Sequence, residues 1–137
     1  MRFTLAGLMS VGVLLAACNG ADRAMTPEGL SQRVGFALPE GTRVVRATPN
    51  AGREGLVRAK LEMSPAAVSR LLAVTQIPKL RVGDADRLGP DHDYWDPHRA
   101  AQLRFGSARL PDSRSVVVGL DEARPDVTVV YLMVHGT

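Results

Sequence analysis

Residues 57–63 alternate between apolar and charged side chains without a break. The apolar positions are Val57, Ala59, Leu61 and Met63, and the charged positions between them are Arg58, Lys60 and Glu62. Because successive side chains of a strand point to opposite faces of a sheet, this pattern predicts a strand with one apolar face and one face in water. The apolar face then needs a second element to cover it.

The residues that follow predict the covering element. Ser64 is suited to cap a helix, Pro65 suits its first position, and Pro78 ends the segment. The positions that recur at helical spacing between them are Val68, Leu71, Leu72 and Thr75. We therefore expect an amphipathic helix of roughly three turns that packs on the apolar face of the sheet.

The rest of the chain predicts a small sheet. Further strands are expected at residues 43–47, 102–108, 113–120 and 127–134, and the last of these is apolar on both faces and therefore central. Residues 76–101 are expected to form a long loop. A chain of 137 residues suits one domain. We predict a single α+β domain over residues 33–137, with a mainly antiparallel sheet of roughly four or five strands packed on one amphipathic helix.

The N-terminus has a different character. Residues 3–17 carry no charge, follow the single Arg2, and are shorter than the about 20 residues of a membrane-spanning helix. The stretch ends in Leu15-Ala16-Ala17-Cys18, which resembles the lipobox of bacterial lipoproteins: a leucine, two small residues and the modified cysteine. All four positions match the motif. The mature domain is not assigned to a characterised family.

The lipobox resemblance implies a processing route and an address. Residues 1–17 would be a signal peptide that is removed, and Cys18 would carry a diacylglyceryl group on its sulfur and an acyl chain such as palmitate on its amine. Residues 18–32 would form a lipidated tether, with a brief helical turn that Thr26 caps and that has Pro27 at its first position. The protein would face away from the cytoplasm in the cell envelope, and Asn19 favours the outer membrane if the host has two membranes. Cys18 is the only cysteine, so no intramolecular disulfide forms.

The charge balance argues against nucleic acid as a partner. The chain has 17 basic and 14 acidic residues, and the basic ones are spread along the sequence rather than gathered in one run. A mildly cationic surface is expected, with partners among envelope proteins or glycans and with the membrane through the anchor.

Residues 84–98 hold the densest group of metal-binding side chain types. Its members are Asp84, Asp86, Asp91, His92, Asp93, Asp96 and His98. Calcium-loop spacing fails, because Leu88 and Trp95 fall where ligands are needed, and the two histidines lack zinc-site spacing. We predict no metal and no cofactor, with His92, His98, Asp91 and Asp93 as weak metal candidates.

Two interpretations exist for Tyr94 and Trp95 in the same segment. They anchor the loop on the core, or Trp95 and Tyr94 form a partner-binding patch with Arg99 and Arg104. No nucleophile elbow or nucleotide-binding loop occurs, so no catalytic residue is predicted. The sequence predicts a noncatalytic lipid-anchored envelope protein that binds or scaffolds. The alternative is a small envelope hydrolase or metal-binding protein that uses residues 84–98.

Overall fold

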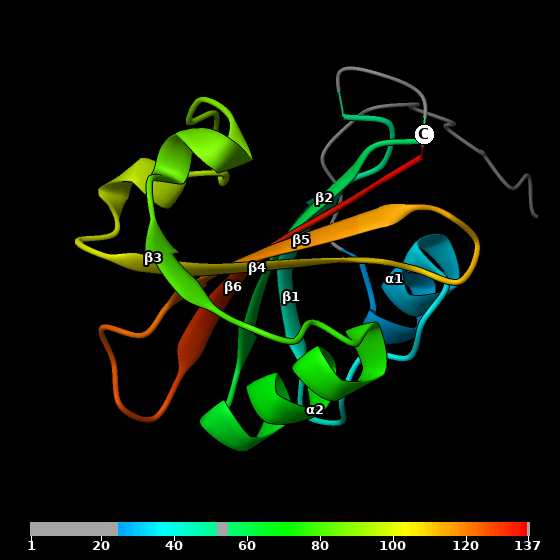
Figure 1. Cartoon of the computed structure of the whole chain (residues 1–137), viewed down its shortest axis with the longest axis horizontal. Helices are drawn as coiled ribbons and strands as arrows, with labels where there is room; N and C mark the ends of the chain where they lie inside the picture. The colour runs from blue at the N-terminus through cyan, green and yellow to red at the C-terminus, as the bar shows by residue number, and fades with distance from the viewer. Residues whose placement is uncertain (1–24, 52–54, 137) are drawn as a thin grey trace, which may run out of the picture.

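A computed structural model of the chain describes residues 25–51 and 55–136 (Figure 1). Cys18 and the predicted signal peptide lie outside these ranges. The elements in chain order are α1 (Pro27–Val34), β1 (Arg43–Thr48), β2 (Val57–Met63), α2 (Pro65–Thr75), β3 (Arg81–Gly83), the 3-10 helices η1 (Ala85–Leu88) and η2 (Pro97–Arg99), β4 (Leu103–Arg109), β5 (Ser115–Asp121) and β6 (Thr128–His135).

All described strands join one antiparallel sheet in the order β1-β2-β6-β5-β4-β3. The predicted α+β class is therefore confirmed, and β6 lies between β2 and β5 as its apolar character predicts. Within the described residues the sheet has six strands rather than the four or five predicted, and there are two α-helices rather than one. The described helices include none with the length and apolar character that crossing a bilayer requires.

Helix α2 covers one face of the sheet. The Ser64 hydroxyl accepts a hydrogen bond from the Ala67 amide at 3.2 Å, and the helix ends where Gln76 adopts a left-handed conformation with φ 57°. Leu71 is fully buried against the apolar side chains of β2, β5 and β6. This face forms the larger of two apolar clusters.

Helix α1 packs on the same cluster. Thr26 caps it, and Leu30 and Val34, one turn apart, are both 0% exposed. Gly35 ends the helix at φ 82°, and Arg114 donates to the Val34 carbonyl at 2.6 Å. The packed part of the chain thus includes residues 27–32, which were expected to belong to the tether. The sequence signal was weak because this short helix contributes only two apolar residues to the core.

Residues 84–101 cover part of the opposite face of the sheet. The buried side chains of this second cluster are Leu88, Trp95, Leu103, Phe105 and Tyr131. Gly119 makes room for it, since a Cβ at that position would lie 2.7 Å from Leu88 Cδ1. The face of β2 that was predicted to be in water is therefore half-covered, and Arg58, Lys60 and Glu62 are only partly exposed.

The predicted loop 76–101 contains the additional strand. β3 has only three residues, Arg81-Val82-Gly83, and none of its side chains is buried. It joins the sheet through backbone pairing with β4, from Arg81 opposite Phe105 to Gly83 opposite Leu103. A strand held by its backbone alone leaves no apolar alternation in the sequence.

Candidate functional site

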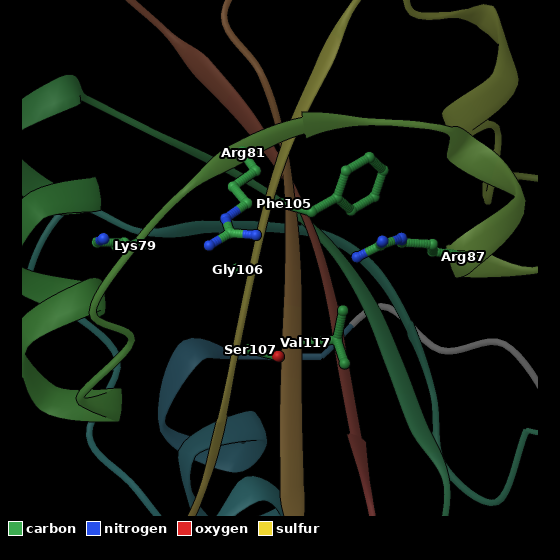
Figure 2. A pocket seen from close by; sticks show the side chains of 7 residues that line it. All are labelled: Lys79, Arg81, Arg87, Phe105, Gly106, Ser107 and Val117. Atoms are coloured by element: carbon green, nitrogen blue, oxygen red, sulfur yellow. The ribbon is translucent and has the colours of Figure 1, made fainter.

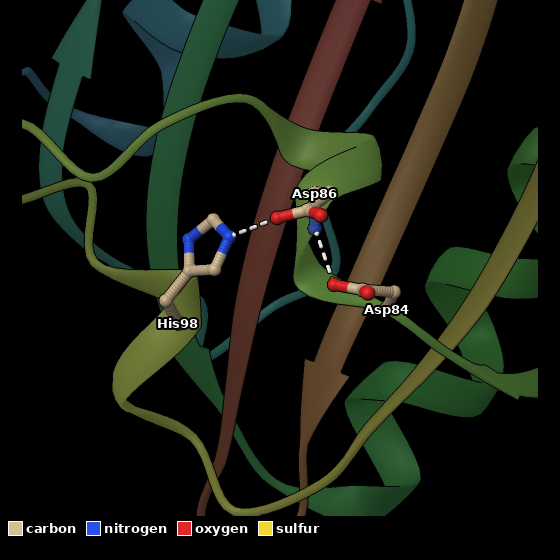
Figure 3. Close-up of side chains that lie close together, drawn as sticks. All are labelled: Asp84, Asp86 and His98. Atoms are coloured by element: carbon tan, nitrogen blue, oxygen red, sulfur yellow. Dashed lines mark hydrogen bonds and ion pairs between the residues drawn. The ribbon is translucent and has the colours of Figure 1, made fainter.

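His98 connects the two 3-10 helices. Its Nδ1 lies 2.7 Å from Asp91 Oδ1. Its Nε2 lies 2.6 Å from Asp86 Oδ1 (Figure 3). The His98 backbone N–H also donates to Asp91, at 3.1 Å. Asp84 caps η1 by accepting from the Asp86 amide at 2.9 Å. We call His98, Asp86 and Asp91 the imidazole clasp.

The two carboxylates favour the charged form of the imidazole. Hydrogen bonds to Asp86 and then Asp91 raise the pKa of His98 above its usual value. Desolvation acts to raise the pKa of Asp91, but hydrogen bonds from His98 outweigh it and hold that pKa below its ordinary value. The clasp is therefore an ion-pair bridge between η1 and η2 at mildly acidic pH.

Asp84, Asp86 and His98 are the one group of described residues whose side chains lie close enough together to bind a metal ion. Ligand atoms of Asp84, Asp86 and His98 lie within 4.8 Å of one another, and all three residues are exposed. Their contacts have a local explanation, because Asp84 caps η1 and Asp86 pairs with His98. His92 and Asp93 stand apart and pair with each other at 3.1 Å. The weak metal candidates therefore do not converge on one centre within the part of the chain described.

The clasp predicts a pH-dependent contribution to stability. A raised histidine pKa stabilises the fold fully below the unfolded value of about 6.5 and loses this effect as pH rises through the folded value. Urea unfolding should therefore show that His98→Ala destabilises the chain more at pH 5.5 than at pH 9. His92→Ala is the matched exposed control. An equal effect of His98→Ala at both pH values would contradict this role.

Trp95 lies where the packing interpretation places it. Its side chain is 1% exposed, its Nε1–H donates to the Leu88 carbonyl at 2.8 Å, and its ring meets Tyr131 edge-on at 5.4 Å. Tyr94 hydrogen-bonds with Thr48 of β1. A buried indole offers no contact surface to a partner.

Asp96 connects the segment of residues 84–101 to strands β2 and β6. Its carboxylate accepts from Lys60 Nζ and from the Tyr131 hydroxyl, each at 2.8 Å. Partial burial acts to raise the pKa of Asp96, but these hydrogen bonds outweigh it and keep that pKa below its usual value. Burial, followed by the Asp96 hydrogen bond, raises the pKa of Tyr131. Asp96 therefore acts as a charged anchor rather than as a metal ligand.

One of the two arginines of the candidate partner patch, Arg104, lies on the other face of the sheet from Trp95. Arg104 alternates with Leu103 and Phe105 on β4, so it points to the opposite face of the sheet from Trp95. Its guanidinium pairs with Glu122 at 2.6 Å. Arg99 is exposed on η2. Trp95, Tyr94, Arg99 and Arg104 therefore do not form one recognition surface.

A different set of basic residues surrounds an open pocket at the β3–β4 edge of the sheet. The pocket has a volume of about 350 Å³ and is lined by Lys79, Arg81, Arg87, Phe105, Gly106, Ser107 and Val117 (Figure 2). Lys79 and Arg81 come from the segment that leads into and forms β3, and Arg87 comes from η1. We call this site the cationic pocket.

The cations of this pocket lack counter-charges. In residues 25–51 and 55–136, no carboxylate forms an ion pair with Lys79, Arg81 or Arg87. All three side chains are exposed, whereas Phe105 beneath them is buried. The site therefore offers several donors around a partly apolar floor, an arrangement that suits a carboxylate or phosphate.

The sequence analysis did not predict that Lys79, Arg81 and Arg87 form one site. Lys79 and Arg81 stand two apart, the spacing that places side chains on one side of an extended segment, and this was the only local signal. Arg87 reaches the pocket only because η1 folds back over β4. The expectation of evenly spread basic residues is thus corrected at this one place.

The small-hydrolase alternative requires a nucleophile beside a base. Across the described ranges, no hydrogen bond joins a serine side chain to a histidine, and Ser107 lines the cationic pocket rather than a catalytic dyad. Comparison of the chain with protein-family models, curated proteins and solved structures finds no match.

Proposed function

We propose that this chain is a noncatalytic, lipid-anchored protein of the bacterial cell envelope that binds an anionic group of a partner in the cationic pocket. The lipobox resemblance at Leu15-Ala16-Ala17-Cys18 supports the anchoring, and Asn19 favours the outer membrane in a host with two membranes. The fold supports binding through a rigid site, because strands β4 and β5 form the floor of the pocket.

The observation that carries the binding proposal is a set of three cations that line one pocket and have no ion pair with a carboxylate of the described residues. Like charges held near one another repel, and an anion between them removes this repulsion while accepting several charge-assisted hydrogen bonds. Elsewhere on the described surface, Arg104 and Arg114 pair with neighbouring carboxylates, and others such as Arg46 stand singly. Lys79, Arg81 and Arg87 differ from these because all three line one hollow.

The position of the pocket favours a partner over the anchoring membrane. Figure 1 shows α1, which begins two residues after the first described residue, and β3 toward opposite ends of the long axis of the molecule. The chain between Cys18 and Met25 spans at most about 25 Å even when fully extended. An anchor at Cys18 would therefore hold the α1 side near the bilayer and leave the β3 side toward the envelope space.

Charge reversal tests the proposal. Arg81→Glu in the purified full chain should weaken the binding of inorganic pyrophosphate by at least about tenfold, because it removes a charge-assisted contact and adds a repulsive one. Isothermal titration calorimetry measures this change. Arg46→Glu, on the opposite edge strand, is the matched control and should bind as the unmodified chain does.

Two results would count against the binding proposal. One is an unmodified chain with no measurable affinity for pyrophosphate at low salt. The other is an equal loss of affinity in Arg81→Glu and Arg46→Glu, which would indicate general charge attraction rather than a site.

The second candidate function is a metal-binding protein or small hydrolase that uses residues 84–98. It is supported by the convergence of Asp84, Asp86 and His98 within 4.8 Å. This candidate predicts that Zn²⁺ raises the melting temperature and that His98→Ala abolishes the rise. A melting temperature insensitive to both Zn²⁺ and chelator would exclude it.

A further inference from the structure

The outer edge of β4 is only partly covered by β3. β4 runs from Leu103 to Arg109, but the pairing with β3 ends at Arg81 opposite Phe105. Before β3, the chain passes beneath Gly106, where a Cβ would lie 3.0 Å from the Lys79 carbonyl oxygen. The far half of the β4 edge, at Ser107 and Arg109, therefore has no neighbouring strand among the described elements.

The register shows which backbone groups this edge exposes. The Leu110 amide donates to the Arg114 carbonyl at 2.7 Å, toward the β5 side. Hydrogen-bonding direction alternates along a strand, so residues 106 and 108 also face β5 while Ser107 and Arg109 face outward. Both residues are exposed. Their N–H and C=O groups form an open template for an added strand.

We infer that the cationic pocket and this open edge together bind an extended acidic peptide segment of a partner protein. This inference rests on the proposed function and names the kind of anion. A peptide residue placed opposite Ser107 projects its side chain to the same face as Ser107, and Ser107 lines the cationic pocket. An Asp or Glu at that position therefore enters the space between Lys79, Arg81 and Arg87.

Backbone pairing and charge supply different parts of the recognition. The added segment continues the line of β3 past the point where the chain turns under Gly106, so its main chain bonds Ser107 and Arg109. Its carboxylates select against basic and neutral peptides through the three cations. A free phosphate or a lipid headgroup satisfies only the charged half of the site.

Hydrogen–deuterium exchange of the purified full chain in detergent tests the inference. The probe is a hexaglutamate peptide, with hexalysine and inorganic pyrophosphate as controls. We expect hexaglutamate alone to slow exchange at the Ser107 and Arg109 amides by at least about tenfold, because only a peptide pairs with both. Vesicles containing phosphatidylglycerol serve as the lipid arm.

A proline substitution tests the contribution of backbone pairing at the β4 edge separately from that of the three cations. Arg109→Pro removes the outward N–H of residue 109 and leaves Ser107 and the three pocket cations in place, and proline is tolerated at an outward edge position. Arg109→Ala is the matched control, because it removes the same charge and keeps the N–H. Arg109→Pro should bind hexaglutamate at least about fivefold more weakly than Arg109→Ala does, whereas the two variants should bind pyrophosphate equally.

The outcomes distinguish the peptide inference from the proposal that the cationic pocket binds an anion. Pyrophosphate and hexaglutamate that bind equally, without protection at Ser107 and Arg109, would overturn the peptide inference and leave the anion site intact. Tighter binding to the vesicles than to hexaglutamate would assign the pocket to lipid headgroups and also overturn it. Failure of every anion to bind would overturn both.

Discussion

Replacing Trp95 by alanine is expected to lower the free energy of unfolding by about 3–5 kcal/mol. The side chain is 1% exposed and is the largest in the described core, so its removal leaves a cavity beneath residues 84–101. The variant also loses the edge-on contact with Tyr131 at 5.4 Å and the hydrogen bond to the Leu88 carbonyl. A small domain has a total stability of about 5–15 kcal/mol, so much of the margin disappears.

Urea unfolding monitored by circular dichroism measures the loss. Trp95→Phe is the matched control, because it keeps an aromatic ring against Tyr131 and removes the indole N–H that bonds Leu88. It should cost about 1–3 kcal/mol, less than the alanine substitution. A Trp95→Ala chain within about 0.5 kcal/mol of the original would show that residues 84–101 do not depend on this anchor.

Replacing Cys18 by serine is expected to release the protein from the membrane almost completely. Each buried methylene of an acyl chain contributes about 0.8 kcal/mol, and two or three chains are needed for a stable anchor. The thioether attachment requires the cysteine sulfur, and Cys18 is the only cysteine of the chain. Incorporation of labelled palmitate and membrane fractionation after expression in a bacterial host measure the change.

The anchor and the binding site are expected to be independent. Arg81→Glu should still incorporate palmitate and fractionate with the membrane, whereas purified Cys18→Ser should still bind pyrophosphate. The lipoprotein assignment is wrong if Cys18→Ser is still processed, still labelled with palmitate and still found in the membrane fraction.

The sequence predicted β1, β2, β4, β5, β6 and α2, and it did so most sharply where the local period is strong. The strict alternation of residues 57–63 predicts β2. Helix α2 is predicted by Ser64, Pro65 and the helical spacing of the apolar residues that follow. Helix α1 was predicted only as a brief turn of the tether, and strand β3 was missed; the two have different reasons. α1 contributes only Leu30 and Val34 to the core, and β3 is held by backbone pairing with β4, which depends on a segment distant in sequence.

In the candidate site, too, the residue types were visible in the sequence, whereas the contacts between them depend on the fold. The Asp and His residues of 84–98 were visible in the sequence, but their pairing as a clasp between two 3-10 helices was not. Two interpretations of Trp95 were open because its burial depends on packing against distant segments, which the local sequence does not show. The cationic pocket could not be predicted, since it forms only when η1 brings Arg87 across the sheet toward Arg81.

The measurement that tests the central claim most directly is a nuclear magnetic resonance titration of the ¹⁵N-labelled full chain, purified in detergent, with pyrophosphate. The account predicts saturable shifts centred on Lys79, Arg81, Arg87 and Ser107, with the imidazole clasp at His98 nearly unaffected. Shifts scattered over all the exposed arginines, or shifts confined to Asp86, Asp91 and His98, would contradict it.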